Sequence, residues 1–404
     1  MPRYFYIAKS LKGEEKTGVL EAKSERELAQ ILRQDGYVLI SASQEKEKKK
    51  NFSFAFFKQS ISLTDKMMFT RNLQVMVSAG ISLPRAIRTL SLQTKNKNFK
   101  KTLLDIAEEI TKGKNLSEAL KTHSNIFSEL FQSMIKVGEE SGTLEEVLGT
   151  LARQMEKDYE LKSKIKGALV YPAVIVCAMV GIGILMLIMV VPKLAETFKE
   201  LEIELPATTR FVIGLGNFLT QKWFLVVLMI VAFIFLFRLI LKTNSGKKFF
   251  DGLFLKIPFI SNIIKKSNSA TLTRTLGSLI TAGVPLLRSL EIVSGTLGNF
   301  YFHQAIVSSI DKVRKGEKLF EALSPYQNLF PPLIVQMLEV GEETGETSSI
   351  LEKLSDFFED EVANTTKNLS AVIEPVMMLL IGGAVGFFAI SMIQPMYSML
   401  GAIK

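Results

Sequence analysis

Three long runs of uncharged, mostly apolar residues constrain this 404-residue chain more than any other feature. The first, Gly167 to Pro192, has 26 residues without a charge, and a helix of that length is about 39 Å long. The second, Trp223 to Leu241, contains a single charge at Arg238, and the third, Pro375 to Ile403, has 29 uncharged residues. Each run can cross a hydrocarbon layer of about 30 Å, so the sequence predicts three transmembrane helices.

The rest of the chain is too polar to lie in a bilayer. Hydrophobic residues make up 48% of the chain and charged residues 22%, the mean hydropathy is +0.24, and the formal net charge is +9. Such values indicate apolar blocks between water-exposed parts. The single Cys177 excludes an internal disulfide, and two distant histidines, His123 and His303, offer little for a zinc site. We therefore expect no metal or other cofactor.

The charges between the apolar runs predict an orientation. Residues 193–222 contain four cations and four glutamates, whereas residues 238–266 contain seven cations and one aspartate. Because positive loops stay in the cytoplasm, the first segment is expected outside and the second inside. The first residues lack the apolar core of a signal peptide, so we expect a cytoplasmic N-terminus and an extracytoplasmic C-terminus. We interpret the positive net charge as a signal for orientation in the membrane. The sequence does not interleave basic and aromatic residues in the way that indicates nucleic-acid binding.

Several short sequences recur at a single separation of 203 residues. Ala-Gly-Ile-Ser-Leu at 79–83 returns as Ala-Gly-Val-Pro-Leu, and Val-Gly-Glu-Glu-Ser-Gly at 137–142 returns as Val-Gly-Glu-Glu-Thr-Gly. The sequence therefore predicts two copies of one unit, at 61–192 and 264–395, each a polar helical region followed by a transmembrane helix. Two parallel copies need one return crossing, which the unrepeated helix at 223–241 provides.

Helical spacing and capping residues predict an antiparallel helical bundle in each copy. In the first copy Thr64 is expected to cap the first helix, and capping boxes are expected at Asn115 with Glu118 and at Thr143 with Glu146. From Leu144 onward an apolar stripe predicts a helix that continues through the following lysines into the membrane.

The first 45 residues have a different pattern, with three predicted strands and one helix that indicate a small α/β module. The whole chain is thus predicted to be mainly α-helical. The expected segments are an α/β module at 1–45, a basic phenylalanine-rich linker at 46–60, a cytoplasmic bundle at 61–166, transmembrane helices at 167–192, 223–241 and 371–400, an outer loop at 193–222, a cytoplasmic connector at 242–263, a second bundle at 264–370 and an outer tail at 401–404.

The sequence has no phosphate-binding loop, nucleophile elbow, zinc-protease motif or dinucleotide fingerprint. Catalysis is therefore not expected, and any ATP use must belong to a partner. Candidate contact residues lie instead in the repeated motifs. They are Arg71, Glu139 and Glu140 in the first copy, and Arg274, Glu342 and Glu343 in the second.

The paired glutamates of these motifs have two interpretations. Each pair comes at the end of a helix, where negative charge opposes the helix dipole. The first interpretation is structural, with a carboxylate that caps the next helix or pairs with an arginine such as Arg71 or Arg274. The second is functional, with a docking surface or a cation site between subunits.

Tyr171-Pro172 and Glu374-Pro375 occupy equivalent places where the chain enters the membrane. An ionisable residue at depth in a bilayer is usually functional, so Glu374 is also a candidate proton carrier. Pro375 to Pro395 already provides 21 residues, however, so Glu374 is more readily placed at the headgroup boundary.

These motifs resemble the type II secretion system F family. The resemblance rests on the starts Phe-Thr-Arg-Asn-Leu at 69–73 and Leu-Thr-Arg-Thr-Leu at 272–276, the Ala-Gly turns, and the Gly-Glu-Glu-x-Gly motifs. Leu169-Val170-Tyr171-Pro172 and Ala371-Val372-Ile373-Glu374-Pro375 are similar to the family's two membrane-entry motifs. The resemblance covers nearly the whole chain.

The resemblance implies a non-enzymatic inner-membrane platform of a type IV pilus or type II secretion machine. Its implied partners are a hexameric ATPase, pilin or pseudopilin subunits, other inner-membrane assembly proteins, the lipid bilayer and further copies of the chain. Two alternatives remain, a small secondary transporter that uses Glu374 and a membrane-tethered scaffold outside any filament system. Three spans and parallel repeats leave little room for a transport site at the midplane.

Overall fold

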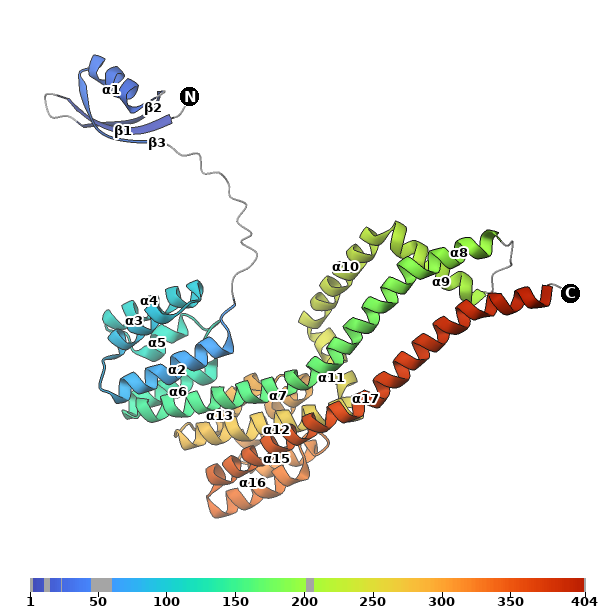
Figure 1. Ribbon diagram of the computed structural model, residues 1–404. Coiled ribbons are helices and arrows are strands. Elements are labelled where there is room, and N and C mark those ends of the chain that lie inside the picture. Colours follow the sequence, from blue (N-terminus) through green and yellow to red (C-terminus); the bar gives the residue numbers. More distant parts are fainter. Residues whose placement is uncertain (1–2, 11–14, 23, 45–59, 201–206, 403–404) are drawn as a thin grey trace. The chain divides into compact units, whose positions relative to one another are not determined.

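The computed structural model describes residues 3–10, 15–22, 24–44, 60–200 and 207–402. It divides into two compact units, Met1–Ser60 and Ile61–Lys404. Of the predicted basic linker at 46–60, all but Ser60 lies outside the described residues. Figure 1 shows that the described part of the large unit consists of helices. Three helices of the described chain are long and apolar enough to cross a membrane, so the predicted mainly helical membrane fold is confirmed.

The small N-terminal unit is a three-stranded antiparallel sheet with one helix. Its strands pair in the order β2-β1-β3, and α1 packs on the sheet through side chains that are fully buried. The helix begins after Ser24, whose hydroxyl accepts a hydrogen bond from the Glu27 amide. The predicted α/β module is therefore confirmed. Its elements are β1 (Arg3–Ser10), β2 (Glu15–Glu21), α1 (Glu25–Gln34) and β3 (Tyr37–Gln44).

The large unit contains two similar helical bundles. The first consists of α2 (Leu63–Ser78), α3 (Leu83–Gln93), α4 (Lys97–Thr111), α5 (Leu116–Lys121), α6 (Glu129–Ser141) and the first part of α7 (Leu144–Leu185). The second consists of α12 (Pro258–Thr281), α13 (Leu286–Thr296), α14 (Phe300–Arg314), α15 (Leu319–Leu323), η2 (Ser324–Tyr326), α16 (Pro332–Thr344) and the first part of α17 (Thr347–Ala402). The helices follow each other in the same order in both bundles.

The backbone at the helix ends repeats as closely as the sequence does. Gly142 has a φ of 75° after α6, and its equivalent Gly345 has a φ of 75° after α16. Gly113 and Gly316 have values of 94° and 95°. Residues with a side chain avoid this left-handed region, so these glycines fix the same turns in both copies.

Aromatic rings fill the cores of both bundles. In the first, Phe99 and Phe127 are each 1% exposed and their ring centroids lie 6.2 Å apart. In the second, Phe302 and Phe330 are fully buried and meet edge to face at 5.1 Å. Burying one such ring contributes about 2 to 3 kcal/mol, so these clusters account for much of the stability of each bundle.

Of three caps predicted from the sequence, one is at the wrong residue and two are at the right residue but lack the expected hydrogen bonds. The capping box of α2 consists of Ser62 and Asp65, so the helix begins before the predicted cap at Thr64. The side chains of Asn115 and Thr143 stand at the N-caps of α5 and α7 but make no capping hydrogen bond. Another side chain therefore has to satisfy the amides of α5.

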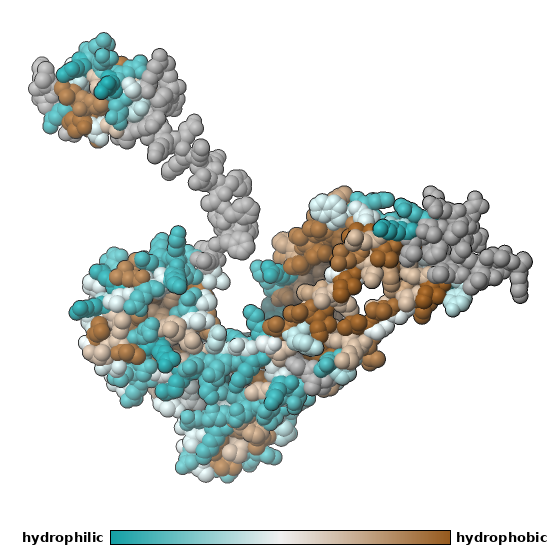
Figure 2. Space-filling model, in the orientation of Figure 1, coloured by the Kyte–Doolittle hydropathy of each residue, from teal (hydrophilic) through white to brown (hydrophobic). Residues whose placement is uncertain are grey.

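Two helices continue from the bundles into the apolar segments, as predicted for the first copy. α7 has 42 residues and α17 has 56, and neither is interrupted between its polar and apolar parts. α10 (Trp223–Lys242) is the third apolar helix, and none of its residues is buried by the described part of the chain. Figure 2 shows apolar residues gathered over α10 and the adjoining parts of α7 and α17.

The segment predicted as an outer loop contains a packed helix. α7 ends in a π-helical turn, η1 (Met186–Val190), and α8 (Val191–Glu200) follows it. α9 (Ala207–Gln221) then packs against η1 and α17, where the buried Thr209 donates a hydrogen bond to the Ser391 carbonyl. A Cβ at Gly216 would lie 2.7 Å from the Leu187 carbonyl oxygen, so only glycine permits this approach.

The segment predicted as a connector after the second apolar helix is itself a helix. It is held against that apolar helix on one side and against the second bundle on the other. α11 (Asn244–Lys256) leaves α10 by a tight corner, because a Cβ at Gly246 would lie 2.0 Å from the Ile240 carbonyl oxygen. On the other side, the Asp251 carboxylate accepts a hydrogen bond of 2.7 Å from the Phe300 amide at the start of α14. α11 therefore links the second bundle to α10.

Candidate functional site

The first glutamate of each repeated Glu-Glu pair caps a short helix. The Glu139 carboxylate accepts hydrogen bonds of 2.5 and 3.0 Å from the amides of Leu116 and Ser117, the first residues of α5. The negative charge lies at the positive end of that helix, where the first amides have no partner within the helix. The carboxylate therefore takes the place of the cap predicted at Asn115.

Glu342 makes the same contacts in the second copy. Its carboxylate accepts hydrogen bonds of 2.8 and 3.0 Å from the amides of Leu319 and Phe320 at the start of α15. In both copies the capped helix precedes the glutamate in the chain, whereas the sequence predicted a cap on the next helix. Neither glutamate pairs with the predicted arginines within the described residues.

The second glutamate of each pair remains at the surface. Glu140 is exposed and forms an ion pair of 3.7 Å with Lys136 on the same helix, and Glu343 is exposed as well. An exposed pair of this kind contributes little to stability. Glu140 and Glu343 are therefore the members of the motif that are free to meet a partner.

The two repeated arginines differ sharply in their surroundings. Arg274 on α12 is only 8% exposed, and its guanidinium contacts Asp158 of α7 and Glu359 of α17, the latter at 2.6 Å. Arg71, at the equivalent place on α2, is exposed. The prediction that a repeated Glu-Glu carboxylate pairs with an arginine is wrong, since Arg274 uses acids from the two long helices.

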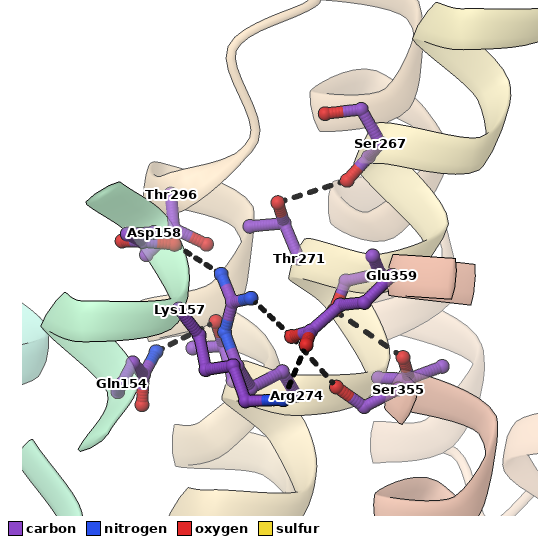
Figure 3. Close-up of polar contacts among 12 residues, drawn as sticks. Gln154, Lys157, Asp158, Ser267, Thr271, Arg274, Thr296, Ser355 and Glu359 are labelled. Atoms are coloured by element: carbon purple, nitrogen blue, oxygen red, sulfur yellow. Dashed lines mark hydrogen bonds and ion pairs between the residues drawn. The ribbon is translucent and has the colours of Figure 1, made fainter. Parts of the chain in front are cut away.

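Arg274 lies at the centre of a polar cluster that joins the two bundles. Figure 3 shows its guanidinium between Asp158 and Glu359, with the end of the Lys157 side chain next to the same Glu359 carboxylate. Lys157 donates a hydrogen bond of 2.8 Å to Glu359 and lies 3.5 Å from Asp356. Two cations thus bridge three acids on α7 and α17, which balances most of the charge that the contact buries.

Neutral side chains complete the cluster. The Gln154 amide of α7 donates a hydrogen bond of 3.0 Å to the hydroxyl of Thr275 on α12, and both residues are buried. The Ser355 hydroxyl lies 3.4 Å from Glu359 (Figure 3). Sequence analysis missed these residues because a polar side chain on a helix is usually solvent-exposed, and only the packing of α7 against α12 and α17 buries them.

The cluster shifts the pKa of Glu359, which lies 16 residues before the charge-free segment that begins at Pro375 and so outside the membrane-spanning part of α17. Burial raises the pKa of the carboxyl, but hydrogen bonds from Lys157 and Arg274 outweigh this effect and leave the pKa below its ordinary value. Glu359 is therefore held as an anion.

A second contact joins the bundles farther from the apolar helices. Arg288 of α13 forms an ion pair of 2.6 Å with Glu129 of α6 and another of 3.0 Å with Glu291 on its own helix. The two acids raise the pKa of the guanidinium. The α6 and α7 side of the first bundle thus faces the α12 and α13 side of the second.

The four membrane-entry residues lie inside the two long helices. Tyr171 is 52% exposed and Pro172 lies within α7, while Glu374 and Pro375 are exposed within α17. The side chain of Glu374 is not enclosed by other residues of the described chain. Its position at the beginning of the apolar segment is the one expected for a residue at the headgroup boundary.

The described residues show no group of three or more histidine, cysteine, aspartate or glutamate side chains with the geometry of a metal site. His303 is held by the second bundle, where its Nδ1 lies 2.8 Å from the Ser294 carbonyl oxygen. What the arrangement offers is mechanical, because a charged cluster fixes two bundles to each other at the base of two long helices.

Comparison with known proteins places both bundles and the N-terminal unit in one family. The family described as "Type II secretion system (T2SS), protein F" matches residues 69–192 and 272–395, two segments separated by the 203 residues found in the sequence. The family described as "Type II secretion system protein F, N-terminal domain" matches residues 1–43. The matched segments include all of α7 and α17 as far as residue 395.

Similar proteins carry two kinds of name. The chain is 33% identical to the "Type IV pilus assembly protein PilC" of Myxococcus xanthus, over all of this chain and 96% of that protein. It is 32% identical to the protein of the same name from Thermus thermophilus, over the full length of both. It is 31% identical to the "Type II secretion system protein F" of Aeromonas hydrophila, over 93% of this chain and 97% of that protein. This chain therefore belongs to the type II secretion system protein F family.

Proposed function

We propose that the chain is an inner-membrane platform that couples a hexameric cytoplasmic ATPase to the insertion of pilin or pseudopilin subunits into a filament. The observation that carries the proposal is the continuity of α7 and α17, which run from the polar bundles into the apolar segments. A helix without a break transmits a displacement of one end to the other. The names of the relatives support assembly of a pilus or a secretion system.

The proposal includes an orientation. The bundles at 61–166 and 264–370 lie in the cytoplasm with the N-terminus, and α8, α9 and the C-terminal tail lie outside. The excess of cations between Arg238 and Lys266 supports this orientation. Both bundles are then available to the ATPase, and the apolar helices to membrane-embedded pilin subunits and to other assembly proteins.

The second glutamates of the repeated motifs are proposed as contacts for a partner. Glu140 and Glu343 are exposed at equivalent places on the two bundles, so a ring-shaped partner with repeated basic sites meets the same charge twice. Neither residue has a role in the core of its bundle. Their substitution therefore separates binding from folding.

Reconstitution tests the coupling directly. The full-length protein in nanodiscs is expected to bind a pilus or secretion ATPase from the same organism and to change its rate of ATP hydrolysis. Glu140→Lys with Glu343→Lys is expected to weaken that effect without lowering the thermal unfolding midpoint. Deletion of the gene is expected to abolish filament assembly or secretion. An unchanged hydrolysis rate together with normal filaments in the deletion strain contradicts the proposal.

A further inference from the structure

The contact between the two bundles of one chain uses different faces of the repeated unit. The first bundle contributes Gln154, Lys157 and Asp158 of α7, which we call the donor face. The name marks the position of the residues in this contact and not the direction of their hydrogen bonds, since Asp158 accepts one from Arg274. The second bundle contributes Arg274 and Thr275 of α12 with Glu359 of α17, which we call the acceptor face. The hydrogen bonds and ion pairs of the polar cluster join these two faces.

Each bundle also has the face that the other one uses. Subtracting 203 from the acceptor residues gives Arg71, Asn72 and Glu156, the acceptor face of the first bundle. Adding 203 to the donor residues gives Phe357, Asp360 and Glu361, the donor face of the second bundle. A contact with true two-fold symmetry would join these two faces as well.

The remaining acceptor face is open in the structure. Arg71 is exposed, and Met68 and Val75, one turn before it and one turn after it on α2, are 47% and 60% exposed. The equivalents of Met68 and Val75 in the second bundle are the smaller, polar Thr271 and Ser278. An exposed stripe of large apolar residues beside an arginine is typical of an interaction surface.

The remaining donor face is open in the same way. Phe357 is 47% exposed on α17, and Asp360 is exposed beside it. Glu361 forms an ion pair of 2.7 Å with Lys266 and keeps about a third of its side chain accessible. The contact within the chain is therefore heterologous, meaning that it joins two different surfaces of the repeated unit. The donor face of the second bundle and the acceptor face of the first bundle remain unoccupied.

We propose that the donor face of the second bundle docks on the acceptor face of the first bundle in another copy of this chain. The partner is a second copy because the contact within the chain already shows how these faces fit. The proposal rests on the proposed function of an assembly platform, and it specifies which surfaces would join the further copies of the chain that the family resemblance implies.

The side chains on the two open faces are largely complementary. The ion pair of Asp158 with Arg274 has its equivalent in Glu361 with Arg71, where the charges keep their signs. Phe357 replaces Gln154, so in the proposed contact its ring would meet Asn72, on the same helix as the exposed Met68 and Val75.

The pairs made by Lys157 change their character. The pair of Lys157 with Asp356 becomes Asp360 with Arg153, in which both charges are reversed and the attraction is kept. The pair of Lys157 with Glu359 becomes Asp360 with Glu156, two acids that repel each other. Arg153 lies one turn before Glu156 on α7 and reduces this repulsion.

A donor face and an acceptor face on each chain have a geometric consequence. Each added chain repeats the same step between bundles, so the assembly closes into a ring when the steps complete a full rotation. Such a ring presents similar bundles at regular intervals, twice as many as it has chains. A two-fold dimer makes the same contact of donor face with acceptor face twice between two chains, and so it stops at two.

Cross-linking between differently tagged chains tests the contact. The single native cysteine is first removed by Cys177→Ser. One tagged chain then carries Asn72→Cys and the other Phe357→Cys, the equivalents of Thr275 and Gln154, and both are co-expressed in membranes. A short thiol-to-thiol cross-linker is expected to yield a product that contains both tags.

Matched variants make the outcome decisive. Leu92→Cys on α3, which is 69% exposed, replaces Asn72→Cys as the control and is expected to yield no such product. Val75→Glu on the acceptor face is expected to reduce the two-tag product several-fold. A product from two chains that both carry Asn72→Cys, or an oligomer by mass measurement that shows no two-tag product, overturns the proposed contact. Either result leaves the effect on ATP hydrolysis, and so the proposed function, to be judged separately.

Discussion

At the scale of single residues, the two glutamates of each repeated motif have separate tasks. Glu139 and Glu342 cap α5 and α15, while Glu140 and Glu343 remain at the surface. Replacing a capping side chain with alanine costs about 1 to 2 kcal/mol. The motif therefore combines a structural residue with one that is available for contacts.

Glu139→Ala is expected to lower the thermal unfolding midpoint of the detergent-solubilised protein, because two amides of α5 lose the carboxylate that accepts their hydrogen bonds. The expected loss is about 1 to 2 kcal/mol. Glu140→Ala, one residue later on the same helix, serves as the control and is expected to leave the midpoint nearly unchanged. Equal effects of the two substitutions argue against the capping role.

Arg274→Met is expected to destabilise the contact between the bundles, because it leaves Asp158 and Glu359 without their shared cation. Breaking a buried pair in this way costs about 3 kcal/mol. Arg71→Met, at the equivalent exposed position, is expected to have almost no effect on the unfolding midpoint of the monomer. If both variants lower the unfolding midpoint by the same amount, the result contradicts the difference in burial between Arg274 and Arg71.

The lowered pKa of Glu359 makes its contribution depend on pH. A carboxyl that loses its proton more readily in the folded state stabilises that state above its ordinary pKa of about 4.5, and the stabilisation disappears as the pH falls through the folded value. Glu359→Gln is therefore expected to unfold at a lower temperature than the native chain at pH 7. The difference is expected to shrink as the pH falls below the ordinary pKa of the carboxyl and through its lower folded value, and a constant difference excludes this carboxyl as its source.

At the scale of elements, the sequence predicted the long helices better than their neighbours. The apolar stripe and the uncharged runs correctly predicted the three long apolar helices, including the continuation of α7 from its bundle. The helical spacing of the stripe and the length of the runs are compatible with few structures other than a long helix. α9 and α11 were missed, since their packing depends on contacts of Gly216 and Gly246 with carbonyl groups of other helices. The cap on α5 was missed for a similar reason, because its acceptor lies 23 residues away.

Gly246→Ala is expected to disrupt the corner between α10 and α11, because the added carbon would lie 2.0 Å from the Ile240 carbonyl oxygen. Gly181→Ala, at a position in α7 with nothing within 4 Å of the added carbon, is the matched control. Yield of folded protein after detergent extraction measures both. Normal yield of the Gly246 variant shows that the corner can open without cost.

At the scale of the whole molecule, the charge-rich cluster could not be predicted from the repeat alone. The repeat showed that two similar bundles exist, but not which faces meet, since Arg71 and Arg274 occupy equivalent places with opposite exposure. Only the packing of α7 against α12 and α17 distinguishes them. The charges that predict the orientation in the membrane are, in contrast, readable from the sequence.

Reporter fusions check that orientation. A reporter that is active only in the cytoplasm is expected to be active when fused after Lys266 and inactive when inserted at residues 201–206 between α8 and α9. A reporter that is active only outside is expected to give the reverse pattern. An active cytoplasmic reporter at both places contradicts the predicted return crossing by α10.

The length of α17 has a consequence for the scale of motion. A helix of 56 residues is about 84 Å long, so a tilt of about 5° around its centre moves each end by about 4 Å in opposite directions. The displacement is directed sideways, across the helix axis. A small angular change imposed on the bundle would therefore move the apolar end of the same helix within the bilayer by about the width of an atom.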